Sequence, residues 1–272
     1  VPKRYYAPDN VIELTALSRF EKVFTEVFES AEGGAAHVAK KIAAIIEKCN
    51  AENRKCVMAL GWGLGTHSVY NELVEMHKAN GFSFANTIVF NVSEFYPATE
   101  GEKSTLSVLK ENFIDNVDIA PENVFSPETS DNVFAYCKQY EDTIAKFGGL
   151  DITLLELGQV GGLSFNEPGS QLSSTTRLML LSKDSQNLVS KVFQTNDKGF
   201  TSAITMGIST LLNAKETFVV AWGEEVASSL KNAVEGQKVR FLINKIRKGK
   251  AEGKLLEVLE KSPVEVDSIC PH

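Results

Sequence analysis

The chain has 272 residues, of which 43% are hydrophobic and 23% are charged, and this composition is sufficient to bury the core of one α/β domain. Its formal net charge of -7 argues against binding to nucleic acid or to a membrane surface, because both need an excess of Lys and Arg on one face. No apolar run approaches the ~18 residues that a membrane-spanning helix needs and no basic leader precedes an apolar segment, so we expect a cytoplasmic protein with a single domain over residues 1–272.

The first part of the chain predicts two strand–helix units. Alternating apolar residues over 22–28 predict a strand, and an apolar stripe at spacings of three and four over 36–49 predicts a helix. The apolar run 56–60 predicts a buried strand that breaks into a glycine loop, after which a helical period resumes over 69–77. This is the order strand, glycine loop, helix.

The same alternation continues through the rest of the chain. The run 87–92 predicts a strand, and a helix follows over 106–114. The run 152–157 predicts another strand that breaks into glycines. The run 218–222 predicts a further buried strand, with a helical stretch over 224–233 behind it.

Strands that alternate with helices are typical of a parallel sheet that is covered on both faces. We therefore expect an α/β fold with a Rossmann-like, doubly wound, mostly parallel sheet. The ligand crevice of such a fold lies at the carboxyl ends of the strands, where the segments 61–66, 91–97, 158–169 and 223–226 fall. The Lys- and Glu-rich tail over 240–261 predicts a solvated helical surface.

The four cysteines, Cys49, Cys56, Cys137 and Cys270, are scattered. They form no C-x-x-C motif, and no His lies at zinc-ligand spacing from them, so we expect reduced and mostly buried thiols and no structural metal site.

Two weaker signals lie at the first glycine loop. His67 follows the loop at a predicted helix start and could contact a ligand, although a packing role is the more frequent one. The glycines Gly61, Gly63 and Gly65 could suggest dinucleotide binding, but their spacing departs from G-x-G-x-x-G.

Two longer motifs resemble those of the glucosamine-6-phosphate deaminase family. They read FNEPGS over 165–170 and YNELVEMHKANGFSF over 70–84. Neighbouring segments match in the same order, including FNVSEF over 90–95 and AITMGI over 203–208. The resemblance runs from about residue 20 to residue 236.

The resemblance implies the fold and the chemistry of that family. Its members convert glucosamine 6-phosphate to fructose 6-phosphate and ammonia, without a metal or an organic cofactor. It also implies a small-molecule sugar phosphate as the partner and self-association into a homo-oligomer.

The resemblance also implies that most proton-transferring residues of the family are substituted here. The family's general base corresponds to Ser93, whose hydroxyl cannot accept a proton at neutral pH without a base beside it. Glu94 could substitute, although successive strand residues point to opposite faces. Two ring-opening residues, an Asp and a His, correspond to Val160 and Gly162. Glu167 survives from that relay, as an acid or as a loop carboxylate that binds backbone amides.

The phosphate-binding residues implied by the resemblance are altered too. The family's Thr-Gly-Ser-Thr loop corresponds to Trp62, Gly63, Leu64 and Gly65, in which glycine amides and the following helix N-terminus could still face an anion. Trp62 could partly fill the pocket. Lys191 takes the place of an Arg and keeps its charge but not its bidentate fork.

Three functions follow from this sequence. The first is a glucosamine-6-phosphate deaminase/isomerase homologue of amino-sugar phosphate metabolism with impaired or lost deaminase activity. The second is a non-catalytic sugar-phosphate-binding protein or partner subunit. The third is related chemistry such as lactone hydrolysis, which rests on fold analogy and has Glu94, Glu167 and His67 as available acid–base groups.

Overall fold

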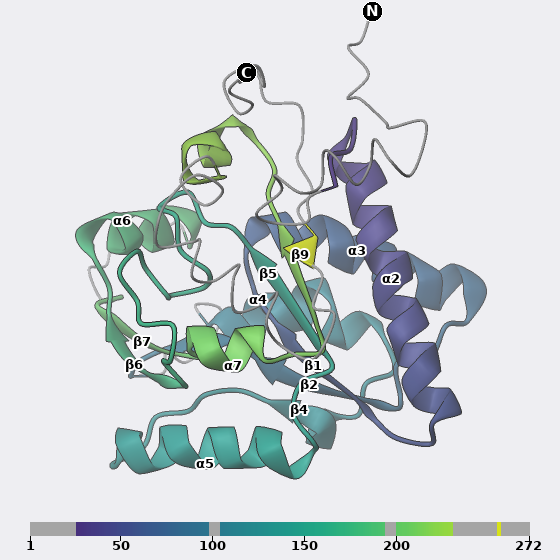
Figure 1. Ribbon diagram of the computed structural model, residues 1–272, viewed down its shortest axis with the longest axis horizontal. Coiled ribbons are helices and arrows are strands. Elements are labelled where there is room, and N and C mark those ends of the chain that lie inside the picture. Colours follow the sequence, from purple (N-terminus) through teal and green to yellow (C-terminus); the bar gives the residue numbers. More distant parts are fainter. Residues whose placement is uncertain (1–25, 98–103, 194–199, 231–254, 257–272) are drawn as a thin grey trace, which may run out of the picture.

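The computed structural model describes residues 26–97, 104–193, 200–230 and 255–256. Its central element is a six-stranded sheet in the order β4-β2-β1-β5-β8-β9, in which every neighbouring pair is parallel (Figure 1). The strands are β1 Cys56–Leu60, β2 Thr87–Asn91, β4 Val124–Phe125, β5 Ile152–Glu156, β8 Glu216–Val220 and β9 Leu255–Leu256. This confirms the Rossmann-like, mostly parallel sheet that the sequence predicts.

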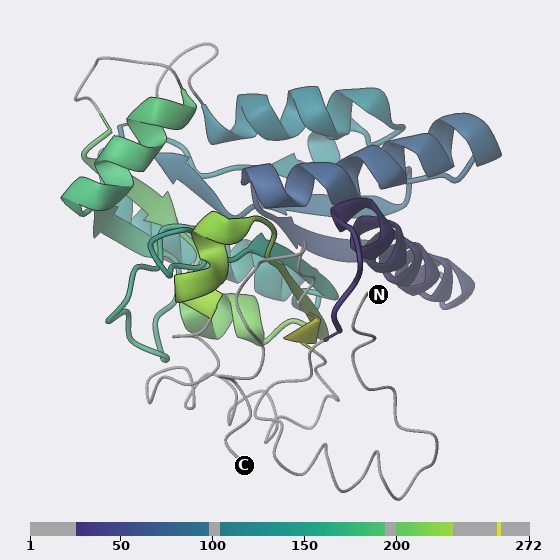
Figure 2. The same ribbon diagram turned by 90° about the horizontal axis from the view of Figure 1, so that it is seen from above.

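The central strands are continuous apolar runs because helices cover both faces of the sheet. Along β1, Met58 and Leu60 belong to one buried cluster, whereas Val57 and Ala59 belong to the other. The first cluster lies under α2, α3 and α4 and the second under α5 and α7, and Figure 2 shows helices on both sides of the sheet. The bounds are α2 Ala31–Ala51, α3 Leu64–Asn80, α4 Thr105–Asn112, α5 Val133–Lys146 and α7 Ile208–Leu212. Short 3-10 turns are η1 Ile114–Asn116, η2 Pro121–Asn123 and η3 Glu224–Val226.

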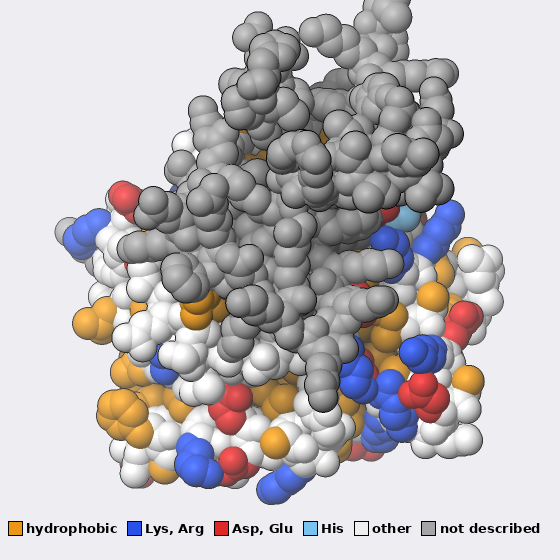
Figure 3. Space-filling view, viewed as in Figure 1, with side chains coloured by type: hydrophobic (Ala, Val, Ile, Leu, Met, Phe, Trp, Pro, Cys, Tyr) orange, Lys and Arg blue, Asp and Glu red, His pale blue; other side chains and the backbone are white. Residues whose placement is uncertain are grey.

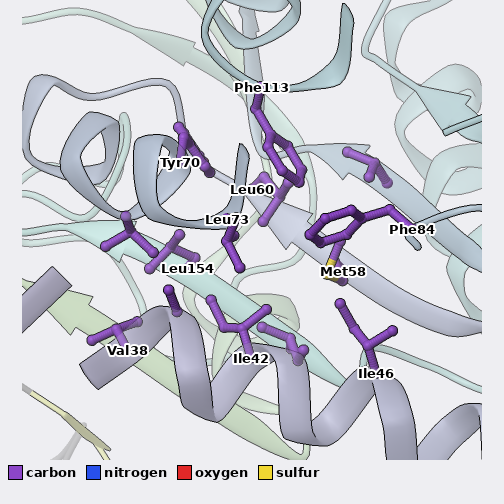
Figure 4. Packing of buried hydrophobic residues seen from close by; sticks show 14 of the residues in the cluster. Val38, Ile42, Ile46, Met58, Leu60, Tyr70, Leu73, Phe84, Phe113 and Leu154 are labelled. Atoms are coloured by element: carbon purple, nitrogen blue, oxygen red, sulfur yellow. The ribbon is translucent and has the colours of Figure 1, made fainter. Parts of the chain in front are cut away.

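Helix α2 illustrates how the pattern of apolar residues sets the packing. The Ser30 hydroxyl caps its first turn by accepting a hydrogen bond from the Gly33 amide at 3.1 Å. Val38, Ile42 and Ile46 follow at spacings of four and point toward the strands (Figure 4). All three are fully buried, and each such side chain stabilises the fold by roughly 1.5–3 kcal/mol.

A second, antiparallel sheet in the order β3-β7-β6 lies beside the first. The sequence did not predict its strands, which are β3 Ser93–Phe95, β6 Arg177–Leu180 and β7 Ser202–Thr205. Helix α6, Lys183–Val192, packs on it through a third buried cluster. The members of this cluster are Phe95, Phe165, Leu181, Val189, Phe200 and Ala203, with Trp62 and Phe193 packed against it.

The predictions from the sequence agree with the central strands but are wrong in two outer segments, 22–28 and 240–261. The predicted strands at 56–60 and 152–157 match β1 and β5 to within a residue. The strand predicted over 22–28 is wrong for residues 26–28, which form no strand because they lead directly into the cap of α2, and 22–25 lie outside the described residues. The helix predicted over 240–261 is wrong at 255–256, which pair with β8 as β9; the rest of that segment lies outside the described residues.

The surface and the cysteines fit the composition. Among the residues that the structure describes, no helix has both the length and the apolar character to cross a membrane. On the face in Figure 3, basic side chains are interspersed with acidic ones. Cys49, Cys56 and Cys137 are buried free thiols, as predicted, and Cys270 lies outside the described residues.

Candidate functional site

The loops that follow β1, β5 and β8 meet at the carboxyl edge of the central sheet. The parallel register places the last residues of β5 and β8, Glu156 and Val220, opposite each other, and β1 ends two residues earlier, at Leu60 opposite Leu154. We call this region the strand-end site and define it by residues 61–65, 93–94, 156–167 and 222–223. It is the place where an open α/β sheet binds its ligands.

The glycine loop after β1 leads into α3, as predicted. Gly63 is the N-cap residue, and no side chain of the loop itself caps the helix. Leu64 is the first residue of α3. The Thr66 hydroxyl donates to the Gly63 carbonyl at 2.7 Å, and the buried Tyr70 hydroxyl donates to the Gly61 carbonyl. The loop is thereby fixed with the amides of the first helical turn free of loop side chains.

Glu156, the last residue of β5, fills the space in front of those amides. Its carboxylate accepts a hydrogen bond from the Gly65 amide at 2.8 Å. Burial raises the pKa of this carboxyl, the Gly65 amide opposes the rise, and the charge of Glu225 adds to it. Trp222 completes the contact by donating from its indole Nε1 to the Gly65 carbonyl.

The two glycines are required by this contact. A Cβ at Gly63 would lie 1.9 Å from Glu156 Oε2, and one at Gly65 would lie 2.9 Å from Trp222 Nε1. Sequence reasoning missed Glu156. An acid at the end of an otherwise buried apolar strand was the available signal, since such residues are seldom buried without a partner.

Ser93, which the resemblance predicts to stand at the family's general-base position, is fully buried in β3. Its Oγ accepts a hydrogen bond from Ser164 Oγ at 2.9 Å, and Ser164 Oγ in turn lies 3.4 Å from Thr205 Oγ1. Among the described residues, no carboxylate or imidazole bonds to the Ser93 side chain. The position therefore holds a chain of neutral hydroxyls.

Glu94 points away from Ser93 and caps α4. Its carboxylate accepts from the backbone amides of Phe95, Thr105 and Leu106 at 2.9, 3.0 and 3.0 Å. It also accepts from the Ser104 hydroxyl at 2.6 Å. Because its lone pairs are used at a helix N-terminus, where negative charge is stabilised, Glu94 has a structural role in this conformation.

The loop over 157–167 contains the other positions that the resemblance predicts to be substituted. Val160 is half-buried and Gly162 is buried. A Cβ at Gly162 would lie 3.0 Å from the Asn166 carbonyl, so a larger side chain there would displace the loop. Glu167 accepts from the amide of Ser182, the N-cap residue of α6, at 2.9 Å. The structure thus supports the amide-binding role for Glu167.

Three further residues were predicted to take part in this site: Trp62, His67 and Lys191. The Trp62 ring packs against the third buried cluster, with centroid distances of 6.3, 6.0 and 5.5 Å to Phe95, Phe165 and Phe193. His67 is half-buried in the first turns of α3. Lys191 lies exposed in the last turn of α6.

One group of possible metal ligands lies at the opposite edge of the sheet. The ligand atoms of Cys49, Cys56 and Asp151 lie within 4.8 Å of one another. Burial raises the pKa of both thiols, and Asp151 is already paired with Arg54 and Lys215 at 2.8 and 2.6 Å. A carboxylate that two cations neutralise, beside thiols that resist ionisation, is a poor metal site.

The chain is similar in sequence to amino-sugar phosphate enzymes. A family model described as glucosamine-6-phosphate isomerases/6-phosphogluconolactonase matches residues 29–252. A glucosamine-6-phosphate deaminase-like protein of Bacteroides thetaiotaomicron is 47% identical over 240 residues, which are 87% of this chain but 36% of that protein, so the chain spans about a third of that relative's length. The glucosamine-6-phosphate deaminase of Colwellia psychrerythraea is 34% identical over 213 residues, or 77% of this chain and 78% of that protein.

Solved structures agree at the level of the fold. A monomeric glucosamine-6-phosphate deaminase superposes with a TM-score of 0.80 at 23% identity, covering 88% of this chain and 98% of that one. The 6-phosphogluconolactonase of Thermotoga maritima superposes with a TM-score of 0.67 at 19% identity, covering 88% of this chain and 100% of that one.

Proposed function

The chain belongs to the glucosamine-6-phosphate isomerase/6-phosphogluconolactonase family, and from that premise we propose that it is a deaminase-like homologue that releases no ammonia from glucosamine 6-phosphate. The observation that carries the proposal is the chemistry at Ser93. Moving a proton between carbons needs a base with a pKa near the working pH, and the Ser93 hydroxyl contacts a neutral hydroxyl, that of Ser164.

The neighbouring acids support the same proposal. Glu94 is bonded to two backbone amides at the start of α4 and to the amide of Phe95 in β3, and Glu167 is bonded to the amide of the N-cap residue of α6. Recruiting either as a base would break these bonds and leave the backbone amides without their carboxylate partners. We therefore assign both residues to the architecture of the site and not to proton transfer.

Ammonia release tests the proposal directly. The purified chain at micromolar concentration is incubated with glucosamine 6-phosphate, beside an intact deaminase such as that of Colwellia psychrerythraea. We expect ammonia from the second enzyme and none above background from this chain. Turnover by this chain that disappears in Ser93→Ala or Glu167→Gln would overturn the proposal. Acid release from 6-phosphogluconolactone, followed in parallel, tests lactone hydrolysis.

A non-catalytic member of this family acts through binding or assembly. The Bacteroides relative is much longer than the match, which leaves room for other parts in that protein. We infer that this chain is a cytoplasmic, self-associating domain that keeps the fold of the family. Its role would be assembly with a partner subunit. One similar solved structure is a monomer, so light scattering on the purified chain decides between a monomer and the homo-oligomer that we propose.

A further inference from the structure

The N-terminus of α3 has the features of an anion site, and its occupant is part of the chain. The helix spans Leu64–Asn80, and the positive end of its dipole lies at the strand-end site. Its N-cap residue, Gly63, has no side chain that could pair with the first amides. The glycine loop lets another group approach the backbone closely. The Glu156 carboxylate makes that approach, at 2.8 Å from the Gly65 amide.

The carboxylate lies directly against the backbone of the glycine loop, where an anion would have to approach. A single added carbon at Gly63 would lie 1.9 Å from Glu156 Oε2, and one at Gly65 would lie 3.0 Å from its carboxyl carbon. The Trp222 indole closes the contact through its bond to the Gly65 carbonyl. A phosphate group is larger than a carboxylate and needs the same amides, so it can bind only if Glu156 moves away.

Electrostatic repulsion opposes the binding of phosphate as well. A phosphate monoester would bring up to two negative charges beside an ionised Glu156, with Glu225 close enough to affect the ionisation of that carboxyl. Like charges in contact repel each other at the effective dielectric of a protein surface. Steric and electrostatic exclusion therefore add.

We propose that the Glu156 carboxylate occupies the position at the N-terminus of α3 that an anionic group of a ligand would take. There it bonds the Gly65 amide and excludes phosphate monoesters from the strand-end site. This inference rests on the proposed function, because it explains how a member of the family can keep the fold without binding the family's class of substrate. Glu156 is thus a specificity-determining residue, and its effect is exclusion.

Binding of inorganic phosphate, measured by isothermal titration calorimetry, tests the inference without any turnover. Glu156→Ala removes the occupant, whereas Glu156→Gln removes its charge and keeps most of its volume. Glu224→Gln is the matched control, because it removes one exposed charge two residues after Trp222. We expect phosphate to bind Glu156→Ala at least about tenfold more tightly than the unmodified chain. Glu156→Gln should be intermediate, and Glu224→Gln should match the unmodified chain.

Equal phosphate affinity in the unmodified chain and Glu156→Ala would overturn the inference, as would undetectable binding by both. The amide resonance of Gly65 in nitrogen–proton spectra gives a second readout: phosphate should shift it in Glu156→Ala and leave it in place in the unmodified chain. Ammonia release from glucosamine 6-phosphate is measured on the same samples. Turnover by the unmodified chain with the tenfold difference intact would refute the proposed function alone, and equal phosphate affinities without turnover would refute this inference alone.

Discussion

Strand β5 is flanked at one end by Asp151 and ends at the other in Glu156, and the two carboxylates are held in opposite ways. Asp151 accepts from Arg54, Lys215 and the Val57 amide at 2.6–2.9 Å. Burial opposes its ionisation, but these donors outweigh burial and lower its pKa. Glu156 has one amide, and burial raises its pKa. A buried carboxylate with several hydrogen-bond donors links segments of the chain and stabilises the fold. A buried carboxylate with a single donor lowers the stability when it is ionised, and this cost suggests a functional role.

Of these substitutions, Asp151→Asn should cause the largest loss of stability, because it removes the carboxylate that has several hydrogen-bond donors. The substitution removes the anion that the partly exposed Arg54 and Lys215 share, and we expect the free energy of unfolding to fall by about 2–3 kcal/mol. Urea unfolding at pH 7 measures the loss. Asp115→Asn removes the same charge from an exposed residue and should change stability little. A loss at Asp151 no greater than at Asp115 would contradict the account.

The pH dependence of the same variant sharpens the test. The pKa of Asp151 is lower in the folded protein than its ordinary value of 3.8, so its stabilisation is present above that value and is lost as the pH falls through the folded pKa. The difference in stability between the unmodified chain and Asp151→Asn should therefore shrink in acid below about pH 4.

Glu94→Gln should have a smaller effect of the same sign. The amide nitrogen of Gln cannot accept from the backbone amides that begin α4, and we expect a loss of about 1–2 kcal/mol in urea unfolding. Glu111→Gln on the same helix removes an exposed charge and is the matched control. If Glu94→Gln left stability unchanged, the capping role assigned to this residue would be refuted.

Glu156→Gln should have the smallest effect and the opposite sign. Because the folded pKa of Glu156 is raised above its ordinary value of 4.5, the ionised group costs stability increasingly as the pH rises from that value through the folded pKa. The thermal midpoint of Glu156→Gln should exceed that of the unmodified chain at pH 8, and the gap should narrow toward pH 4.5. A variant that is less stable at pH 8 would show that the Gly65 bond outweighs burial.

The central strands and the small antiparallel sheet differ in how far the sequence predicts them. Strands such as 56–60 are buried on both faces, so their composition alone identifies them. The small sheet escaped prediction because its strands are short and β6 is only partly buried, ending in Leu180, whose exposed fraction is 78%. The family resemblance directed attention to Ser93 and the glycine loop, whose functional roles stay a prediction.

What the sequence could not supply is the partner of each polar group. Glu156 lies 91 residues from Gly65, and nothing local to either residue indicates that they bond. Glu94 and Glu167 have the residue type of proton-transfer groups, and their bonds at the starts of α4 and α6 emerge only when distant segments are placed together. Residue type suggests a chemistry, but geometry decides whether the group is available for it.

The placement of the aromatic residues has a practical consequence. The sequence contains two tryptophans, and both flank the end of β5: Trp62 in a cage of phenylalanine rings after β1, and Trp222 bonded to the Gly65 carbonyl after β8. The intrinsic tryptophan fluorescence of the unlabelled protein therefore originates at the strand-end site, beside the Glu156 carboxylate. A change in this fluorescence would therefore report whether the Glu156 carboxylate stays in place at the strand-end site.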